Sequence, residues 1–333
     1  MYSNILSWTQ QKNWPIIIDE QDFEKKALQL FHYQFAHNEI YRQFAEGLRR
    51  HPDNVQRMTD IPFLPVSFFK THEVLCQPPT QDMLYFESSG TTGTVNSKHY
   101  VPDATLYERS FNAGFRQFYG KPEEYIFLCL LPSYLEKGHS SLIYMANSLI
   151  QQSGRQESKF VLQDTKQLAT ELMRLKAAGE QIILLGVTYA LLDFARDFPL
   201  DLTGVIVMET GGMTGRKEEW TRFQVHQFLK EKWQLKQIHS EYGMTELLSQ
   251  AYAAEAGVFS CSQQMKILLR EINDPLQLMT EGTGLINVID LANIHSCAFL
   301  ATEDIGKLYT DGSFEVLGRA DHSALRGCSL LAL

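Results

Sequence analysis

The stretch Gln181-Ile-Ile-Leu-Leu-Gly-Val187 decides the fold, because it is a continuous apolar run between two helical patterns. A short run of this kind is typical of a strand that is buried on both faces of a parallel sheet. A helix over Thr165–Ala178 precedes it, and a second strand is expected at Gly204–Met208. The segment Ile182–Leu192 therefore indicates a buried strand followed by a helix.

The same alternation continues on both sides of this run. Tyr125–Leu131 is expected to form a strand before a helix over Ser141–Gln151. A helix over Lys217–Trp233 precedes a strand-like segment at Gln237–Ser240. Strands that alternate with helices predict an α/β fold, built of layered sheets with flanking helices.

The two ends of the sequence follow other patterns. Residues 1–60 are expected to be mostly helical, because apolar side chains recur there at helical spacing. The proline-containing segment Ile61–Lys70 then interrupts the helical pattern. From Gly284 onward we expect short strands and turns, with Asp311-Gly312 at the turn of a hairpin.

The composition narrows the class of protein. The chain has 333 residues, of which 44% are hydrophobic and 21% charged, as in folded globular proteins. Its net charge of −9 argues against nucleic acid as the main partner, which requires a basic surface. No apolar run reaches the roughly 18 residues of a membrane span, and no basic residue precedes an apolar run at the N-terminus as in a signal peptide. The five cysteines are scattered and contain no C-x-x-C pair, so we expect a cytoplasmic protein.

The first candidate motif is Glu87-Ser-Ser-Gly-Thr-Thr-Gly-Thr-Val-Asn-Ser-Lys98. Glycines let backbone N–H groups approach an anion closely, and hydroxyls and a lysine supply further donors, which suits a polyphosphate. The motif is not a P-loop, because Lys98 follows Ser97 rather than a glycine. A polar surface loop is the alternative.

The second candidate motif is Glu241-Tyr-Gly-Met-Thr-Glu246, directly after the strand expected at Gln237–Ser240. An aromatic residue beside a glycine is suited to stack on a base, and a Thr-Glu pair is suited to place an oxygen on Mg²⁺. The alternative is a strand end at which Thr245 caps a helix over Glu246–Ala253.

The third candidate motif combines Thr302-Glu-Asp-Ile-Gly306, Asp311-Gly312 and Gly318-Arg-Ala-Asp321. Asp304 is suited to accept hydrogen bonds from two ribose hydroxyls, and Arg319 is suited to join it there. The alternative is a hairpin with a polar turn.

In their order and spacing, the three motifs resemble those of the adenylate-forming superfamily: acyl-CoA synthetases, luciferases and peptide-synthetase adenylation domains. The resemblance extends from about residue 60 to residue 328. Further segments resemble the acyl-protein synthetase branch, known from the fatty-acid reductase complex of bacterial bioluminescence. These segments are Leu131-Pro-Ser-Tyr-Leu-Glu136, Ser140-Ser-Leu-Ile-Tyr-Met145, Glu209-Thr-Gly-Gly-Met-Thr-Gly215 and Arg326-Gly-Cys-Ser329.

This resemblance implies the large N-terminal domain of the adenylate-forming fold without its small C-terminal domain. It divides the chain into a helical segment (1–60), an adenylation core (61–321) and a short tail (322–333). In the family, a catalytic lysine lies in the small domain, about a hundred residues beyond the aspartate that matches Asp321. Only twelve residues follow Asp321 here, so we expect that lysine to be absent.

The resemblance also implies ATP and Mg²⁺ as cofactors and assigns roles to single positions. Lys98 and Arg319 match catalytic positions, Thr91 and Glu246 match the positions that hold Mg²⁺, and His139 and Gly243 match the border of the acyl pocket. For His139, a plain loop histidine is the alternative. The positions that match ATP-binding residues are Ser88, Ser89, Gly90, Thr91, Thr92, Gly93, Lys98, Gly211, Gly212, Tyr242, Gly243, Thr245, Asp304 and Arg319.

The implied reaction is attack of a carboxylate on the α-phosphate of ATP to give an acyl-adenylate. The resemblance implies a fatty acid as the substrate. In the acyl-protein synthetases the acyl group then passes to a cysteine near the C-terminus, which Cys328 matches, and from there to an acyl reductase. Arg326 favours ionisation of the Cys328 thiol, whereas an inert thiol in a packed terminus is the alternative. The other cysteines (Cys76, Cys129, Cys261 and Cys297) are expected to be core or surface thiols.

Two other functions remain open at this point. One is an acyl- or aryl-acid ligase that passes its adenylate to the thiol of CoA or of a carrier protein. The other is a non-catalytic nucleotide-binding subunit that has kept the pocket. Consumption of ATP that depends on an added acid distinguishes the enzymes from the subunit.

Overall fold

A computed structural model describes residue 5 and residues 17–88, 95–132, 138–162, 164–211 and 220–320. The helices within these residues are α2 (Glu20–His37), α3 (Glu39–Gly47), η2 (Met58–Asp60), η3 (Val66–Lys70), α4 (Ala104–Tyr119), η4 (Pro122–Glu124), α6 (Ser141–Ser153), α7 (Thr165–Ala177), α8 (Thr188–Asp197) and α9 (Arg222–Trp233). The strands are β1 (Leu64–Pro65), β2 (Leu84–Glu87), β3 (Lys98–Val101), β4 (Ile126–Leu130), β5 (Lys159–Phe160), β6 (Ile182–Val187), β7 (Ile206–Thr210), β8 (His239–Tyr242), β9 (Ala251–Ala253), β10 (Val258–Cys261), β11 (Met265–Arg270), β12 (Leu278–Met279), β13 (Gly282–Asp290), β14 (Phe299–Leu308) and β15 (Phe314–Arg319).

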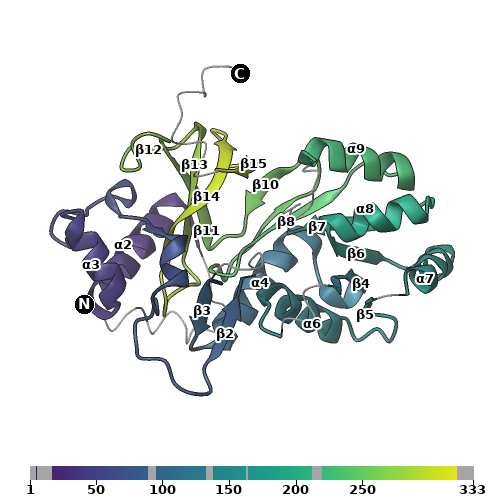
Figure 1. Ribbon diagram of the computed structural model, residues 1–333, viewed down its shortest axis with the longest axis horizontal. Coiled ribbons are helices and arrows are strands. Elements are labelled where there is room, and N and C mark those ends of the chain that lie inside the picture. Colours follow the sequence, from purple (N-terminus) through teal and green to yellow (C-terminus); the bar gives the residue numbers. More distant parts are fainter. Residues whose placement is uncertain are drawn as a thin grey trace.

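The parallel half of the fold has the predicted alternation of strands and helices. Strands β8, β7, β6, β4 and β5 lie side by side in this order and run parallel. Every residue of β6 is buried, as its apolar run predicts. Figure 1 shows α8 and α9 on one side of these strands and α4 and α6 on the other. The carboxyl ends of the strands therefore meet at one edge of the sheet, where α/β proteins bind their ligands.

Beyond β8 the sheet becomes antiparallel. It continues in the order β9, β10, β15, β14, β13, β11 and β12, with β1 beside β14, to make thirteen strands in all. Strands β14 and β15 form the hairpin expected around Asp311-Gly312, and Gly312 has a φ of +82° at its turn. The expectation of only short strands here is wrong, since β13 has nine residues and β14 has ten. Both are long because most of their residues are buried within the sheet.

Two expectations about the second motif are corrected by the structure. β8 ends at Tyr242, so Glu241 and Tyr242 belong to the strand rather than follow it. The alternative of a helix over Glu246–Ala253 is wrong, because Ala251–Ala253 form β9, which pairs with β8. The chain before β9 is held in a turn by Asp290, whose carboxylate accepts the amide protons of Leu248 and Ser249 at 2.7 and 3.0 Å.

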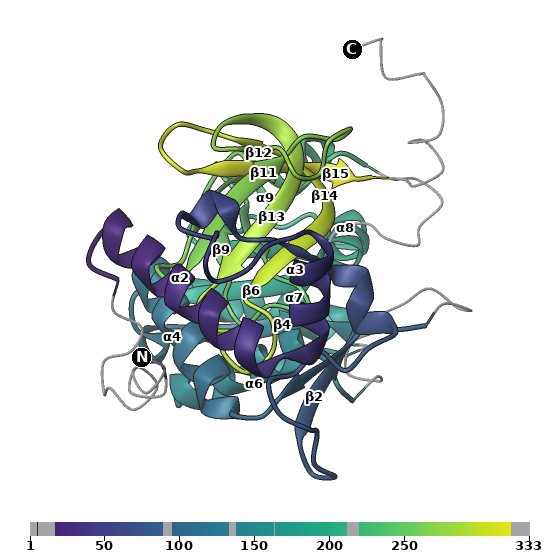
Figure 2. The same ribbon diagram turned by 90° about the vertical axis from the view of Figure 1, so that its left-hand side faces the viewer.

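The helical N-terminal segment is confirmed over Glu20–Gly47, whereas residues 1–4 and 6–16 lie outside the description. Figure 2 shows α2 and α3 in front of the antiparallel strands. Gln34 of α2 is fully buried; its Nε2 donates to the carbonyls of Asn293 and Ile294 at 2.7 and 3.0 Å. Its Oε1 accepts the amide proton of Ala298 at 3.0 Å. One side chain thus fixes α2 to the segment that joins β13 to β14.

The described part of the chain contains no helix with the length and apolar character that a membrane crossing requires. The aromatic clusters near residues 63–69 and 111–119 lie mainly in the hydrophobic core.

We predict that Gln34→Leu lowers the free energy of unfolding by about 3 kcal/mol, because two carbonyls and one amide lose their buried partner. Urea unfolding at pH 7 measures the change. Gln21→Leu, at an exposed position of the same helix, is the control and should leave the midpoint unchanged. An unchanged midpoint in Gln34→Leu would contradict the proposed attachment of α2.

Candidate nucleotide and acid site

The β2–β3 hairpin carries the first motif. Glu87 and Lys98 pair at its loop end, and Lys98 Nζ lies 3.9 Å from the ring centre of Tyr85 and 4.6 Å from that of Tyr100. A hydrogen bond with Tyr100 raises the pKa of Lys98, so the amine carries a positive charge over these two rings. The loop residues 89–94 lie outside the description. It therefore does not place Ser89, Gly90, Thr91, Thr92 and Gly93.

The two ends of this loop are bonded to each other. Ser88 N donates to Ser97 O at 3.0 Å, and Ser97 N donates to Ser88 Oγ at 2.9 Å. The buried side chain of Ser97 also hydrogen-bonds Glu246 of the second motif. Burial raises the pKa of Glu246, and the bond from Ser97 opposes this effect by stabilising the carboxylate. The end of the glycine-rich loop therefore lies against the carboxylate that is expected to hold Mg²⁺.

His99 makes a second link between the first two motifs. It follows Lys98 on β3 and points to the opposite, buried face, where its Nδ1 donates to the carbonyl of Thr245 at 2.8 Å. Its Nε2 lies 3.2 Å from Oδ1 of Asn293, and Nδ2 of Asn293 donates to the carbonyl of Glu246 at 2.8 Å. Burial lowers the pKa of His99 to about 4, so the imidazole is neutral at pH 7.

The second motif is bonded in turn to the third. The Tyr242 hydroxyl donates to Oδ2 of Asp304 at 2.9 Å, and Nε of Arg319 lies 3.3 Å from Oδ1 of the same carboxylate. Asp304 and Arg319 are directly paired between β14 and β15. Each oxygen of Asp304 keeps a lone pair for a ligand hydroxyl, since each has one partner among the residues that the structure describes. The ring of Tyr242 packs edge-on against Phe259 and Phe314.

The end of β7 joins the parallel strands to the hairpin of the third motif. Burial by itself would raise the pKa of Glu209, but Arg222 and His226 lower it to about 2. Arg222 Nε donates to Glu209 at 3.0 Å, and its NH1 donates to the carbonyl of Val316 on β15 at 3.1 Å. Gly211 follows β7 with a φ of +76°, which favours glycine, while Gly212 lies outside the description.

The two residues expected at the acyl pocket lie at different places. His139 is exposed, stacks on Tyr85 with ring centres 4.1 Å apart, and accepts the amide proton of Glu87 through its carbonyl. Gly243 follows β8 and is also exposed. A Cβ at Gly243 would lie only 2.6 Å from Oε1 of Glu241, so a larger residue would displace that carboxylate.

Four cysteines are described, and all are free thiols: Cys76, Cys129, Cys261 and Cys297. Burial raises the pKa of each thiol, to about 12 for Cys129, Cys261 and Cys297. They therefore remain protonated and are poor nucleophiles, as expected of core thiols. Cys328 lies outside the description.

No cluster of three or more metal-ligating His, Cys, Asp or Glu side chains occurs among the residues described. Proteins usually bind Mg²⁺ through one or two carboxylates together with substrate phosphates. Glu246 provides such a carboxylate next to the glycine-rich loop.

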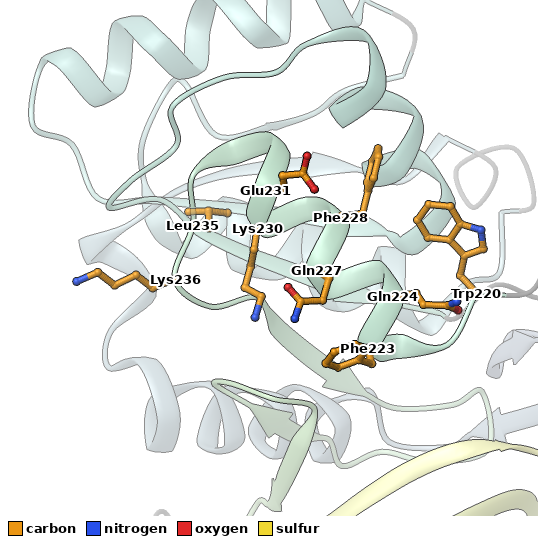
Figure 3. Close-up of a pocket in the computed structure, with 9 residues that line it drawn as sticks. All are labelled: Trp220, Phe223, Gln224, Gln227, Phe228, Lys230, Glu231, Leu235 and Lys236. Carbon is orange, nitrogen blue, oxygen red and sulfur yellow. The ribbon is translucent and has the colours of Figure 1, made fainter.

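An open hollow of about 750 Å³ lies on the outer side of α9 (Figure 3). None of the predicted site residues lines it. Its lining residues are Trp220, Phe223, Gln224, Gln227, Phe228, Lys230, Glu231, Leu235 and Lys236.

The comparisons with known structures agree with the fold. ATP-bound MatB from Rhodopseudomonas palustris is similar in structure, with a TM-score of 0.54 and 14% identity over 73% of this chain and 49% of MatB. An ATP-bound RpMatB-BxBclM chimera has a TM-score of 0.55, with 14% identity over 73% and 49% of the two chains. Apo MatB has a TM-score of 0.52, with 13% identity over 72% and 48%. This chain thus spans about half the length of these structures, and its fold is that of the adenylate-forming enzymes.

The sequence comparison defines the family. The model described as "Acyl-protein synthetase, LuxE" matches residues 5–332, and the chain belongs to this acyl-protein synthetase family. A search of curated proteins gave no match.

We predict that His99→Gln removes part of the pH dependence of stability. The imidazole has a pKa of about 4 when folded and about 6.5 when unfolded, so the unfolded chain takes up the proton first as the pH falls. This group therefore lowers the wild-type free energy of unfolding by about 2 kcal/mol between pH 7 and pH 5.

Urea unfolding at the two pH values measures this difference, which should be smaller in His99→Gln. His51→Gln, at an exposed position, should keep the wild-type difference. If His99→Gln also kept it, His99 would not be the buried neutral group inferred here.

Proposed function

We propose that this protein uses ATP to convert a carboxylic acid into an acyl-adenylate and then transfers the acyl group to the thiol of Cys328. The observation that carries the proposal is one continuous chain of contacts through the three motifs. Ser97 and His99 of the β2–β3 hairpin bind the segment Thr245–Glu246, and Tyr242 binds Asp304. The residues that bind the polyphosphate, the metal ion and the ribose of one nucleotide must lie close together, as these three motifs do. Membership of the acyl-protein synthetase family and the likeness to ATP-bound MatB give further support.

In this proposal each motif binds one part of ATP. Ser88 and Lys98 bind the phosphates together with the loop residues, and Glu246 holds Mg²⁺ together with Thr91. Tyr242, Gly243 and Thr245 border the adenine with Gly211 and Gly212, while Asp304 and Arg319 bind the ribose. Mg²⁺ supplies neutralisation of phosphate charge when it is bound.

The charges of the site fit the first chemical step. An oxygen of the acid attacks the α-phosphorus, the bond to the bridging oxygen of the β-phosphate breaks, and pyrophosphate leaves. Because an anionic carboxylate approaches an anionic phosphate, positive charge is needed at this point. The ammonium group of Lys98 and the guanidinium of Arg319 supply it from this chain.

In the second step, the acyl group is transferred to Cys328. The thiolate sulfur attacks the acyl carbon, the bond between that carbon and the phosphate oxygen breaks, and AMP leaves with the electron pair. The raised pKa values of the four described thiols speak against any of them as acceptor. Transfer from Cys328 to an acyl reductase, and a fatty acid as the substrate, are what the family resemblance implies.

We predict that Lys98→Ala lowers acid-dependent pyrophosphate release by at least about 100-fold, because a cation at the phosphates is lost. Lys307→Ala is the matched control, since Lys307 also lies over a tyrosine ring, at 4.8 Å from the centre of Tyr309. Unchanged release in Lys98→Ala would overturn the assignment of the phosphate loop. Binding of ATP without any release by the wild type would instead favour a non-catalytic subunit.

We predict that incubation with ATP, Mg²⁺ and the correct acid adds the mass of one acyl group to the wild type and to Cys261→Ala, but not to Cys328→Ala. Intact-mass spectrometry measures the adduct, and pyrophosphate release by Cys328→Ala should continue. If the wild type released pyrophosphate without forming an adduct, and if it acylated added CoA or a carrier protein, the acceptor would be that thiol rather than Cys328.

A further inference from the structure

The side of β8 that faces away from Asp304 carries a buried polar cluster that the steps above do not use. Side chains alternate along a strand, so Tyr242 points to Asp304 while Glu241 points to the opposite face. Tyr252 of β9 pairs directly with Glu241, which places both side chains on this face. Gln250 lies near Glu241, because both are close to the position that a Cβ on Gly243 would occupy. Gln250 Cγ is 3.6 Å and Glu241 Oε1 is 2.6 Å from this position. We call Glu241, Gln250 and Tyr252 the polar cluster.

The hydrogen bonds of this cluster are incomplete. Gln250 and Tyr252 are each 3% exposed, and Glu241 is 7% exposed. The Oε1 atom of Gln250 and the hydroxyl of Tyr252 have no hydrogen-bond partner among the residues that the structure describes. Buried polar atoms in proteins are nearly always paired, because an unpaired one destabilises the fold. These two atoms therefore point to a missing partner, and they lie together on one face of the β8–β9 ribbon.

The surroundings of the cluster suit an organic acid. Aromatic side chains of α4 form its apolar border: the ring of Tyr252 lies 5.3 Å from that of Phe118 and 5.4 Å from that of Tyr119. A Cβ on the exposed residue Gly243 would lie 2.6 Å from Glu241 Oε1, so the glycine keeps this position free of a side chain. A ligand that lies over Gly243 therefore comes close to the cluster, on the other side of β8 from the proposed ribose position.

We propose that the acid activated by this protein carries a hydrogen-bond donor, a hydroxyl or an amino group, which the polar cluster binds. This inference rests on the proposed function and adds the class of its substrate. The carboxylate of Glu241 and the amide oxygen of Gln250 accept hydrogen bonds, and the Tyr252 hydroxyl both accepts and donates. A donor on the ligand is therefore the group that completes them. An unsubstituted alkyl chain would leave these atoms unpaired, and sites of this kind strongly reject an analogue that lacks the bonding group.

The state of Glu241 agrees with either kind of donor. Burial raises the pKa of Glu241 to about 7, while Thr210, which donates to its Oε2, acts in the opposite direction. An amino group that enters as a cation would favour the ionised carboxylate, whereas a hydroxyl donates to the carboxyl group in either state.

The test compares matched acids in an assay of ATP-dependent pyrophosphate release. Octanoate and benzoate are each measured beside derivatives that carry one hydroxyl or one amino group at successive positions. We expect the best donor-bearing acid to have a kcat/KM at least about 100-fold above that of its unsubstituted parent. Tyr252→Phe and Gln250→Leu should reduce the ratio of the two kcat/KM values toward one. The control Gln227→Leu, at an exposed position of α9, should leave this ratio unchanged. A purely structural role would lower kcat/KM for all acids without changing the ratio.

The outcomes separate this inference from the proposed function. If pyrophosphate release is equally fast or faster with the unsubstituted acids, the proposed function stands, but the polar cluster is not a donor-binding site. No release with any acid, while a thermal shift shows that ATP binds, overturns the proposed function and this inference with it. Glu241→Gln distinguishes an amino donor from a hydroxyl donor. It should remove a preference for amino-substituted acids and keep a preference for hydroxy-substituted acids.

Discussion

The buried polar contacts of Asn293 are the constraint on which the arrangement of the site depends. Its side chain lies between the imidazole of His99 and the carbonyl of Glu246, so the β2–β3 hairpin and the second motif share one residue. Its own carbonyl accepts a proton from Gln34 of α2. The N-terminal helix, the glycine-rich hairpin and the Thr245–Glu246 segment thereby meet at a single position. Because each of these polar groups is buried, a shift of any one of them would leave the others unpaired, which fixes the geometry of the whole junction.

Charge is distributed in the site so that two neighbouring buried carboxyl groups have different states. Glu209 is ionised because Arg222 and His226 lie beside it, and the resulting ion pair joins β7 to the hairpin of β15. Glu241 lies one strand away, and burial together with the charge of Glu209 raises its pKa. Glu209 is thus an ionised structural element, whereas the raised pKa of Glu241 allows a ligand to change its protonation state. This difference arises from Arg222 and His226 beside Glu209, although both carboxyl groups are equally acidic in isolation.

The sequence predicted the parallel core because its signals are local. Apolar runs such as Ile182–Val187, and helices that begin at capping residues such as Ser140, depend on few neighbours. The three motifs were likewise visible as short strings. The roles of His99 and Asn293 were not predicted, because they arise from contacts between residues about 194 positions apart. The position of His99 next to Lys98 in a strand was the one available signal, since alternation turns it toward the core.

The second motif shows why a motif does not by itself give the structure around it. Its residues fit both a helix cap and a strand end, and only the pairing of β8 with β9 decides between them. That pairing makes Glu241 and Tyr242 part of a strand, in which consecutive side chains point to opposite faces of the sheet. Tyr242 therefore contacts Asp304, while Glu241 lies across from Tyr252. If the segment were a helix, these two side chains would not be separated by the sheet. The strand thus divides the region that the ribose-binding proposal uses from the region that contains the polar cluster, and it places Gly243 between them.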